Sequence, residues 1–386
     1  MLSRSAPYLG IFVALLLGIL FAFVSDDAPV SLTSTQPISN DSLTPDGQLI
    51  FVESTTTPPS LEQEKSIKDI RQAETVISTK ETLTPVKALV AEASTKIAQV
   101  FAPVALSSSE SASLDASATT LRSALVNIIC FAPSGSGIRS ISGSGVLIDP
   151  KGIILTNAHI AQYFLLAERN VSCKVRAGSP AVEKYEAALI YIPFPWVQAN
   201  ASVLTEANPS GTGEYDFAFL AITKSATSVA LPSLFSFVPL ATTPPHTGTP
   251  VVIGSYGAQF LESSQIQSFL FPTLVFGSVK DIFTFASTTI DVLALGGSVA
   301  AQEGSSGGGI SDVNGELVGV ITTSTTKGPT STRSLGAITS SYIRSEYASE
   351  TGEALDLLLA QPLSVAIADF APHLPALELI LTSQLP

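Results

Sequence analysis

Three short segments that lie far apart in the chain carry side chains that together can activate a hydroxyl group. They are Thr156-Asn157-Ala158-His159, Tyr215-Asp216-Phe217-Ala218 and Gly304-Ser305-Ser306-Gly307-Gly308-Gly309. A serine hydroxyl is a poor nucleophile at neutral pH, so it needs a neighbouring base to take its proton and a third group to hold that base in the right tautomer. The order histidine, aspartate, serine therefore predicts a nucleophilic site built from His159, Asp216 and Ser306.

The glycine-rich segment around Ser306 can also supply the hydrogen-bond donors that such a reaction needs. Glycine lets backbone N–H groups turn toward one point, where they stabilise the oxyanion that forms when a carbonyl is attacked. The N–H groups of Gly304 and Ser306 are the candidate donors. Glycine–serine runs are commonly flexible linkers, but apolar segments flank this one, which is unusual for a linker. Ser305 is the competing nucleophile.

Each of the other two residues also has an ordinary structural explanation. His159 follows an apolar segment, 153–156, and opens a short helical turn over 158–166. A lone histidine in such a place is more often structural than catalytic. Asp216 directly precedes an apolar strand, where an acid is usually a turn or capping residue. The chemical interpretation therefore depends on the three segments occurring together, each beside a strand.

The elements that must position these residues are β-strands. Between about residues 119 and 343, short apolar segments rich in β-branched residues are bounded by Gly, Pro or Asn, a pattern typical of strands. Asn314-Gly315 is a strong hairpin signal. Many short strands with little helix predict barrels or a sandwich. The expected strands are 126–132, 141–148, 152–156, 171–175, 187–193, 217–223, 250–255, 270–279, 288–295, 316–323 and 334–339.

Composition and cysteine usage limit the partners of the chain. It has 386 residues, 13% of them charged, and a formal net charge of −13. Phosphate binding needs a basic stripe, so the acidic balance argues against nucleic acid as a partner. Neither cysteine lies in a CxxC motif, which argues against a zinc site, and no metal is expected. Cys130 and Cys173 form a disulfide if their compartment is oxidising; the alternative is two buried thiols.

The N-terminal region has the features of a membrane anchor followed by a stalk. Residues 8–24 are uninterrupted and apolar, with Arg4 before them and acidic residues after them, so we expect 1–26 to span a membrane with the rest outside the cytoplasm. A cleaved signal peptide is the alternative. Residues 27–118 are rich in Ser, Thr and Pro and predict a largely disordered stalk, with helical patterns at 61–80 and 86–101.

The remaining boundaries follow from the strand pattern. Residues 119–345 form the expected β domain, and residues 346–386 form a tail of helical and irregular structure. The apolar runs in this tail are shorter than a membrane span, so we expect the tail to cap the core of the preceding domain.

The region from about residue 121 to residue 343 resembles a trypsin-like serine protease of the chymotrypsin fold, closest in style to the HtrA group of bacterial proteases. The three segments named above carry this resemblance together with two others. Ser142-Gly143-Ser144-Gly145-Val146-Leu147-Ile148 is similar to the first hairpin of that group, and Gly315-Glu316-Leu317-Val318-Gly319-Val320 follows the glycine-rich run.

The resemblance implies an all-β fold of two six-stranded antiparallel β-barrels with the active site between them. It implies that His159 is the general base and acid, Asp216 the orienting carboxylate and Ser306 the nucleophile, with the oxyanion bonded by the Gly304 and Ser306 backbone. Proteins or peptides are the implied substrates, and no metal or organic cofactor is needed. The segment 320–324 is expected to pair with the extended substrate backbone.

The chain departs from the family's pattern at several positions. Ser305 stands where the family usually has Asn or Asp, and Gly309 stands where it usually has Pro. Extra glycine loosens the oxyanion loop, and loose donors stabilise charge poorly. The segment 191–213 is longer than usual, and the residues after Ile343 are too few for the PDZ domain that HtrA proteins generally carry. Small neutral residues at 297–301 predict an uncharged specificity pocket.

These observations favour a membrane-tethered serine endopeptidase acting on the periplasmic or extracellular side, because all three candidate catalytic residues are retained. A catalytically silent protease-like domain used for binding is the alternative. A stalked surface protein whose glycine run is only a turn is a third hypothesis. The oligomeric state and the natural substrate stay open.

Overall fold

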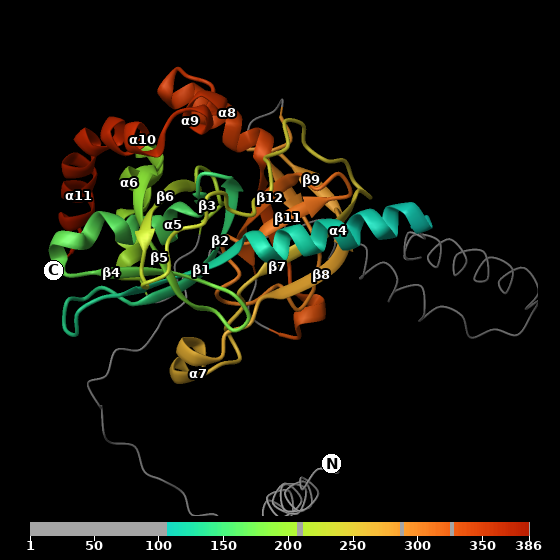
Figure 1. Ribbon diagram of the computed structural model, residues 1–386, viewed down its shortest axis with the longest axis horizontal. Coiled ribbons are helices and arrows are strands. Elements are labelled where there is room, and N and C mark those ends of the chain that lie inside the picture. Colours follow the sequence, from blue (N-terminus) through green and yellow to red (C-terminus); the bar gives the residue numbers. More distant parts are fainter. Residues whose placement is uncertain (1–105, 207–210, 286–288, 325–327, 386) are drawn as a thin grey trace, which may run out of the picture. The chain divides into compact units, whose positions relative to one another are not determined.

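The strands of the described residues form one closed barrel and one open sheet (Figure 1). The computed structural model describes residues 106–206, 211–285, 289–324 and 328–385. The expected anchor at 1–26, most of the expected stalk and the helical patterns at 61–80 and 86–101 lie outside the described residues. All strand pairings in both sheets are antiparallel.

The closed barrel is six-stranded. In spatial order its strands are β1 (Leu125–Phe131), β2 (Ile141–Asp149), β3 (Ile153–Thr156), β6 (Ala218–Ser225), β5 (Val182–Tyr191) and β4 (Ser172–Ala177). β4 pairs again with β1 and closes the ring. β2 is buried along its whole length, because one of its faces lines the barrel and the other faces the second sheet and the glycine-rich loop.

The second sheet corrects the expectation of two six-stranded barrels. Its seven strands follow the order β8 (Thr273–Ser278), β7 (Pro250–Ser255), β11 (Gly309–Asp312), β12 (Leu317–Ser324), β13 (Leu335–Thr339), β10 (Val292–Ala294) and β9 (Asp281–Phe283). β8 and β9 are its two edges, and no pairing between described residues joins them. The sheet is therefore an open half-barrel. A separate group of buried apolar side chains, mainly from its strands, forms its core.

Cys130 and Cys173 are opposite each other on neighbouring strands of the barrel. They are register partners on β1 and β4, their Cα atoms are 4.0 Å apart, and a disulfide joins them. The bond links two strands that already pair, on the side of the barrel where β1 ends and β4 begins.

Helix α4 (Ser108–Ala124) begins inside the segment assigned from the sequence to the stalk. Ser107 and Glu110 form a capping box at its start. Its buried residues recur at helical spacing on one face, which packs against β7, β11 and β2. The side chain of Leu121 fills the space beside two glycines of the second sheet, Gly254 and Gly309. The helix thus leads directly into β1 of the barrel and also packs against β7 and β11 of the open sheet.

Short helices connect the strands, and a helical tail follows them. The connections are α5 (Ala158–Ala161), η1 (Gln162–Arg169), α6 (Phe194–Asn200), η2 (Ala201–Leu204), α7 (Ser263–Ser268) and η3 (Thr330–Thr332). The tail comprises α8 (Ser340–Thr351), α9 (Leu355–Ala360), α10 (Leu363–Phe370), η4 (Ala371–His373) and α11 (Leu374–Thr382). In Figure 1 the tail follows one side of the barrel, where α10 contacts β5 and α11 contacts α6.

Part of this tail is strongly apolar. Residues Leu363–Thr382 are long and apolar enough to cross a membrane, judged by length and composition alone. Three of their side chains, Ala366, Leu377 and Leu381, are nevertheless buried in the main hydrophobic core. The tail therefore covers the barrel in this structure.

The packing of α4 predicts a measurable loss of stability on truncation. Leu121→Ala is expected to lower the free energy of unfolding by about 2–5 kcal/mol, the usual cost of removing a fully buried leucine side chain. Leu357→Ala, at a position that is 57% exposed on α9, is the control and is expected to change stability by about 0.5 kcal/mol or less. Urea denaturation of both variants measures this, and equal stability of the two would show that α4 is not part of the folded unit.

Candidate active site

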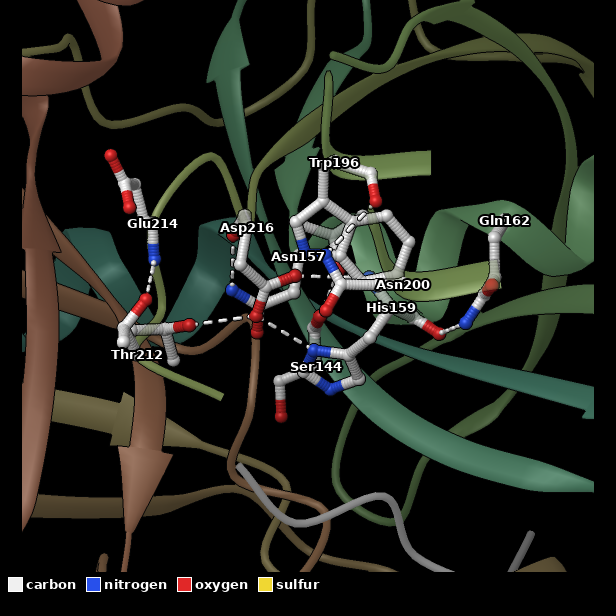
Figure 2. Close-up of polar contacts among 11 residues, drawn as sticks. Ser144, Asn157, His159, Gln162, Trp196, Asn200, Thr212, Glu214 and Asp216 are labelled. Carbon is white, nitrogen blue, oxygen red and sulfur yellow. Dashed lines mark hydrogen bonds and ion pairs between the residues drawn. The ribbon is translucent and has the colours of Figure 1, made fainter. Parts of the chain in front are cut away.

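His159 and Asp216 form a buried pair in which the carboxylate holds the imidazole. The His159 Nδ1 and Asp216 Oδ2 atoms are 2.8 Å apart, and the His159 backbone N–H donates to the other carboxylate oxygen at 3.0 Å (Figure 2). Both side chains are about 2% exposed. Because the same carboxylate binds the ring and the backbone of one residue, it determines both the position and the rotation of the imidazole.

The pair has a defined tautomer. A carboxylate accepts hydrogen bonds, so Nδ1 carries the proton that points at Asp216, and Nε2 of the neutral ring is then an acceptor. Among the described residues, Nε2 has no hydrogen-bond partner although it is buried. An unpartnered buried acceptor is costly and is typical of a site that completes its bonding with a substrate or a catalytic group.

The ends of two paired strands place these two residues. β3 ends at Thr156, and α5 begins after Asn157 with His159 in its first turn. β3 pairs with β6, which begins directly after the turn that contains Asp216. The Asn157 side chain donates to the Asp216 carbonyl at 2.8 Å and ties the two strand ends together (Figure 2).

The turn before Asp216 is held from the helical tail. Tyr215 has a positive φ of 57°, and its N–H donates to the Tyr342 hydroxyl of α8 at 3.2 Å. Burial raises the pKa of Tyr342, so this phenol stays neutral. Burial, with the nearby charges of Asp291, Glu214 and Glu350, also raises the pKa of Glu346. An acidic group of side chains thus lies on the tail side of the pair.

Thr322 of β12 supplies a further donor to the carboxylate, from the second sheet. Its hydroxyl donates to Asp216 Oδ2 at 2.7 Å, the same oxygen that faces the imidazole. Thr322 is almost fully buried. Thr322 lies in the segment expected to pair with substrate, but the sequence does not indicate its bond to Asp216, since only the packing of the two sheets brings the two residues together.

The loop that carries Ser306 lies between the barrel and β12. The Ser306 carbonyl accepts from the Ser144 N–H of β2 at 2.8 Å, and the Gly307 N–H donates to the carbonyl of Ile321, the neighbour of Thr322, at 2.9 Å. A Cβ added to Gly307, whose φ is +83°, would lie 2.6 Å from the Thr156 hydroxyl. The loop therefore lies between Thr156, which is close in sequence to His159, and Ile321, which precedes Thr322.

The structure leaves the Ser306 hydroxyl without a hydrogen bond to His159. No bond joins the Ser306 hydroxyl to the imidazole in the described part of the chain, and Ser306 is partly exposed. Ser305 differs in accessibility, since it is fully buried and its hydroxyl faces the interior without a partner. Of the two serines only Ser306 can meet a substrate in this conformation.

The peptide groups before the two candidate oxyanion donors are held in place. The Glu303 carbonyl accepts from the Ala258 N–H at 2.8 Å, and the Ser305 carbonyl accepts from the Gly308 N–H at 2.9 Å. In a trans peptide the N–H points away from the C=O. The Gly304 and Ser306 N–H groups are therefore turned away from these contacts, and neither donates to a described acceptor.

Within the residues that the structure describes, no group of three or more His, Cys, Asp or Glu side chains could hold a metal ion.

Comparisons with known proteins agree with this arrangement of strands. Residues 143–320 match the family model described as trypsin-like peptidase domain. No curated protein matches the chain. Among solved structures, the active form of the Rv3671c protease from M. tuberculosis is 19% identical, with a TM-score of 0.39, and the match covers 62% of this chain and 85% of that one.

A serine-to-alanine mutant of Rv3671c in its inactive form is also 19% identical, with a TM-score of 0.39, and the match covers 67% of this chain and 98% of that one. The family match spans the three segments that carry His159, Asp216 and Ser306. Residues 143–320 therefore form a trypsin-like peptidase domain.

Proposed function

We propose that the chain is a membrane-tethered, extracytoplasmic serine endopeptidase that cleaves peptide bonds through a triad of Ser306, His159 and Asp216. The observation that carries this proposal is the His159–Asp216 pair. Its protonated Nδ1 faces the carboxylate at 2.8 Å, and its Nε2 has no partner among the described residues. Hydrogen bonds of catalytic groups are often completed only when substrate binds, so the unbonded Ser306 hydroxyl is compatible with this role.

The proposed reaction proceeds through an acyl-enzyme. As the Ser306 oxygen attacks the substrate carbonyl carbon, His159 Nε2 takes the hydroxyl proton, and the imidazolium that forms is stabilised by Asp216. The carbonyl oxygen becomes an oxyanion that accepts from the N–H groups of Gly304 and Ser306. His159 then protonates the leaving amine, and water, activated by the same imidazole, releases the acyl group.

The alternative, a silent protease-like domain used only for binding, predicts the same fold but no reactive serine. Two observations favour the enzyme. The carboxylate of Asp216 accepts three hydrogen bonds that orient His159, and the peptide groups of the glycine-rich loop are held with two N–H groups unused. A domain without catalysis has no need of a buried imidazole nitrogen that lacks a partner.

We further propose the division of the chain that the sequence suggested. Residues 1–26 anchor the protein, 27–118 form the stalk, 119–345 form the catalytic domain, and 346–386 form the tail. Helix α4 crosses the boundary between stalk and domain, so the stalk would end in a folded helix packed on the domain. Protein or peptide substrates would be cleaved outside the cytoplasm, and no cofactor takes part in the proposed steps.

A serine-directed fluorophosphonate reagent tests the proposed nucleophile. We expect the wild-type protein to be labelled at Ser306, with labelling abolished in Ser306→Ala and lowered by at least about a thousandfold in rate in His159→Ala. Ser305→Ala is the matched control and should be labelled normally, because its hydroxyl faces the interior. Labelling that persists in Ser306→Ala would assign the nucleophile elsewhere, and no labelling of the wild type would favour the binding domain.

The contact between Thr322 and Asp216 predicts a smaller catalytic effect. Thr322→Val removes one of the three donors to the carboxylate and is expected to lower kcat/KM about 3–10-fold, the equivalent of one modest hydrogen bond. Ser117→Ala, which removes a buried hydroxyl of α4 bonded to the Asp312 carbonyl, is the control for loss of stability alone. If both variants lose the same activity at matched folded fraction, Thr322 does not act through Asp216.

The anchor is tested on protein made in cells. If residues 8–24 remain as a membrane span, the mature protein should begin at Met1 and stay with the membrane fraction after carbonate extraction. N-terminal sequencing and fractionation measure this. A mature N-terminus near Asp26, in protein released by carbonate, would instead show a cleaved signal peptide.

A further inference from the structure

We infer that Ser144 is a positioning residue that keeps the oxyanion loop assembled, through a hydroxyl that connects the barrel, the loop and the end of β7. This inference rests on the proposed function. Ser144 is fully buried on β2 and is drawn with the His159–Asp216 pair in Figure 2. Ser144 lies in the segment 142–148, which is similar to the first hairpin of HtrA proteases, and that similarity implies no role for its side chain.

Every polar group of Ser144 is used in a bond to another element. Its hydroxyl donates to the Gly304 carbonyl at 2.8 Å and accepts from the Tyr256 N–H at 2.8 Å. Its own N–H donates to the Ser306 carbonyl at 2.8 Å, and its carbonyl accepts from the Thr156 hydroxyl at 2.7 Å. One residue of the barrel thus holds two carbonyls of the nucleophile loop and a strand end of the second sheet.

These bonds complete the fixation of the loop backbone. The Ala258 and Gly308 N–H groups bond the carbonyls of Glu303 and Ser305. These carbonyls belong to the same peptide groups as the unused N–H groups of Gly304 and Ser306. Ser144 holds the two peptides that follow Gly304 and Ser306. Without the hydroxyl, only the peptide after Gly304 loses the donor to its carbonyl. The peptide group between Gly304 and Ser305 is then free to rotate, and Gly304 is the residue of the loop that restricts this rotation least.

Gly304 is the permissive position. Its φ of +85° is accessible to glycine at little cost, and glycine also allows many other conformations. The positions occupied by Ser305 and Gly309 lack the side chains that the resemblance leads one to expect, and extra glycine favours a looser loop. The hydroxyl of Ser144 supplies an external restraint there. Because preorganised donors stabilise the transition state more than bound substrate, loss of the restraint should lower kcat rather than raise KM.

The variant Ser144→Ala tests this inference, and Ser142→Ala is its matched control. Ser142 is also a buried serine of β2, but its hydroxyl accepts only from the Asn127 side chain, which also donates to the Gly143 carbonyl. The probe is the fluorogenic peptide amide that the wild type cleaves fastest in a series that varies the residue before the scissile bond. The trifluoromethyl ketone of the same peptide reports how well the oxyanion is bound.

We expect Ser144→Ala to lower kcat about 10–100-fold, somewhat less than the loss of an oxyanion donor itself, with KM changed less than about threefold. The affinity for the trifluoromethyl ketone should fall by the same factor as kcat. Ser142→Ala should keep both values within about threefold of wild type. All assays are made well below the lowest Tm of the set, so that each variant is folded.

Three results would overturn the inference while the proposed function stands. They are unchanged kcat in folded Ser144→Ala, a loss confined to KM, and an equal loss in Ser142→Ala. If Ser144→Ala does not fold, Ser144→Cys keeps nearly the same volume with a weaker donor, and its kcat should fall about 3–10-fold; unchanged kcat would refute the inference. A wild type without activity or labelling would instead reject the proposed function.

Discussion

The bond between the Asp216 carboxylate and His159 is the interaction on which the rest of the site depends. One carboxylate oxygen accepts the backbone N–H of His159 and holds the carboxylate beside this residue. The other oxygen faces Nδ1 of the ring, and the imidazole loses this contact if it turns. The pair is buried, which strengthens each contact in a low dielectric and makes unpaired groups there costly. With Nδ1 occupied, the only ring nitrogen left to accept a proton is Nε2, which has no partner among the described residues.

The second constraint is that the residues of the candidate site come from two sheets, one a closed barrel and the other open. His159 and Asp216 come from the ends of β3 and β6 in the barrel, whereas Ser306 comes from the loop before β11 in the open sheet. Their relative position therefore depends on contacts that cross between the sheets. The Thr322 hydroxyl reaches Asp216, Ser144 reaches the loop, and the side chain of Leu121 on α4 fills the space beside glycines of β7 and β11. Accessibility then separates the two adjacent serines, since Ser305 faces the interior.

Much of this arrangement could be predicted from the sequence because it depends on local pattern. All eleven predicted strands occur, with ends that shift by a few residues, since β-branched apolar runs between turn residues report strands directly. β9, a strand of three residues, and β11, a Gly-Ile-Ser-Asp segment, were not predicted, because neither has a distinctive apolar run. Helix α4 was also missed, because its stretch is rich in serine and alanine and only two leucines mark its buried face.

Features that depend on tertiary contact could not be read from the sequence. The expectation of a second closed barrel was wrong for the described residues, because β8 and β9 end as unpaired edges, and strand pattern alone does not reveal which edges meet. The bonds of Thr322 and Ser144 join residues more than a hundred positions apart, so neither spacing nor composition indicates them. The looser loop expected from the extra glycine, Gly309, stays a prediction, and the loop's own residues do not reveal that Ser144 of β2 bonds two of its carbonyls.

The most direct measurement of the central claim is a crystal structure of the protein after reaction with a fluorophosphonate. The account predicts phosphorus bonded to the Ser306 oxygen, the phosphoryl oxygen accepting from both the Gly304 and Ser306 N–H groups, and His159 Nε2 within hydrogen-bond distance of the adduct while Nδ1 remains on Asp216. Phosphorus on another residue, or a phosphoryl oxygen turned away from those two N–H groups, would contradict it.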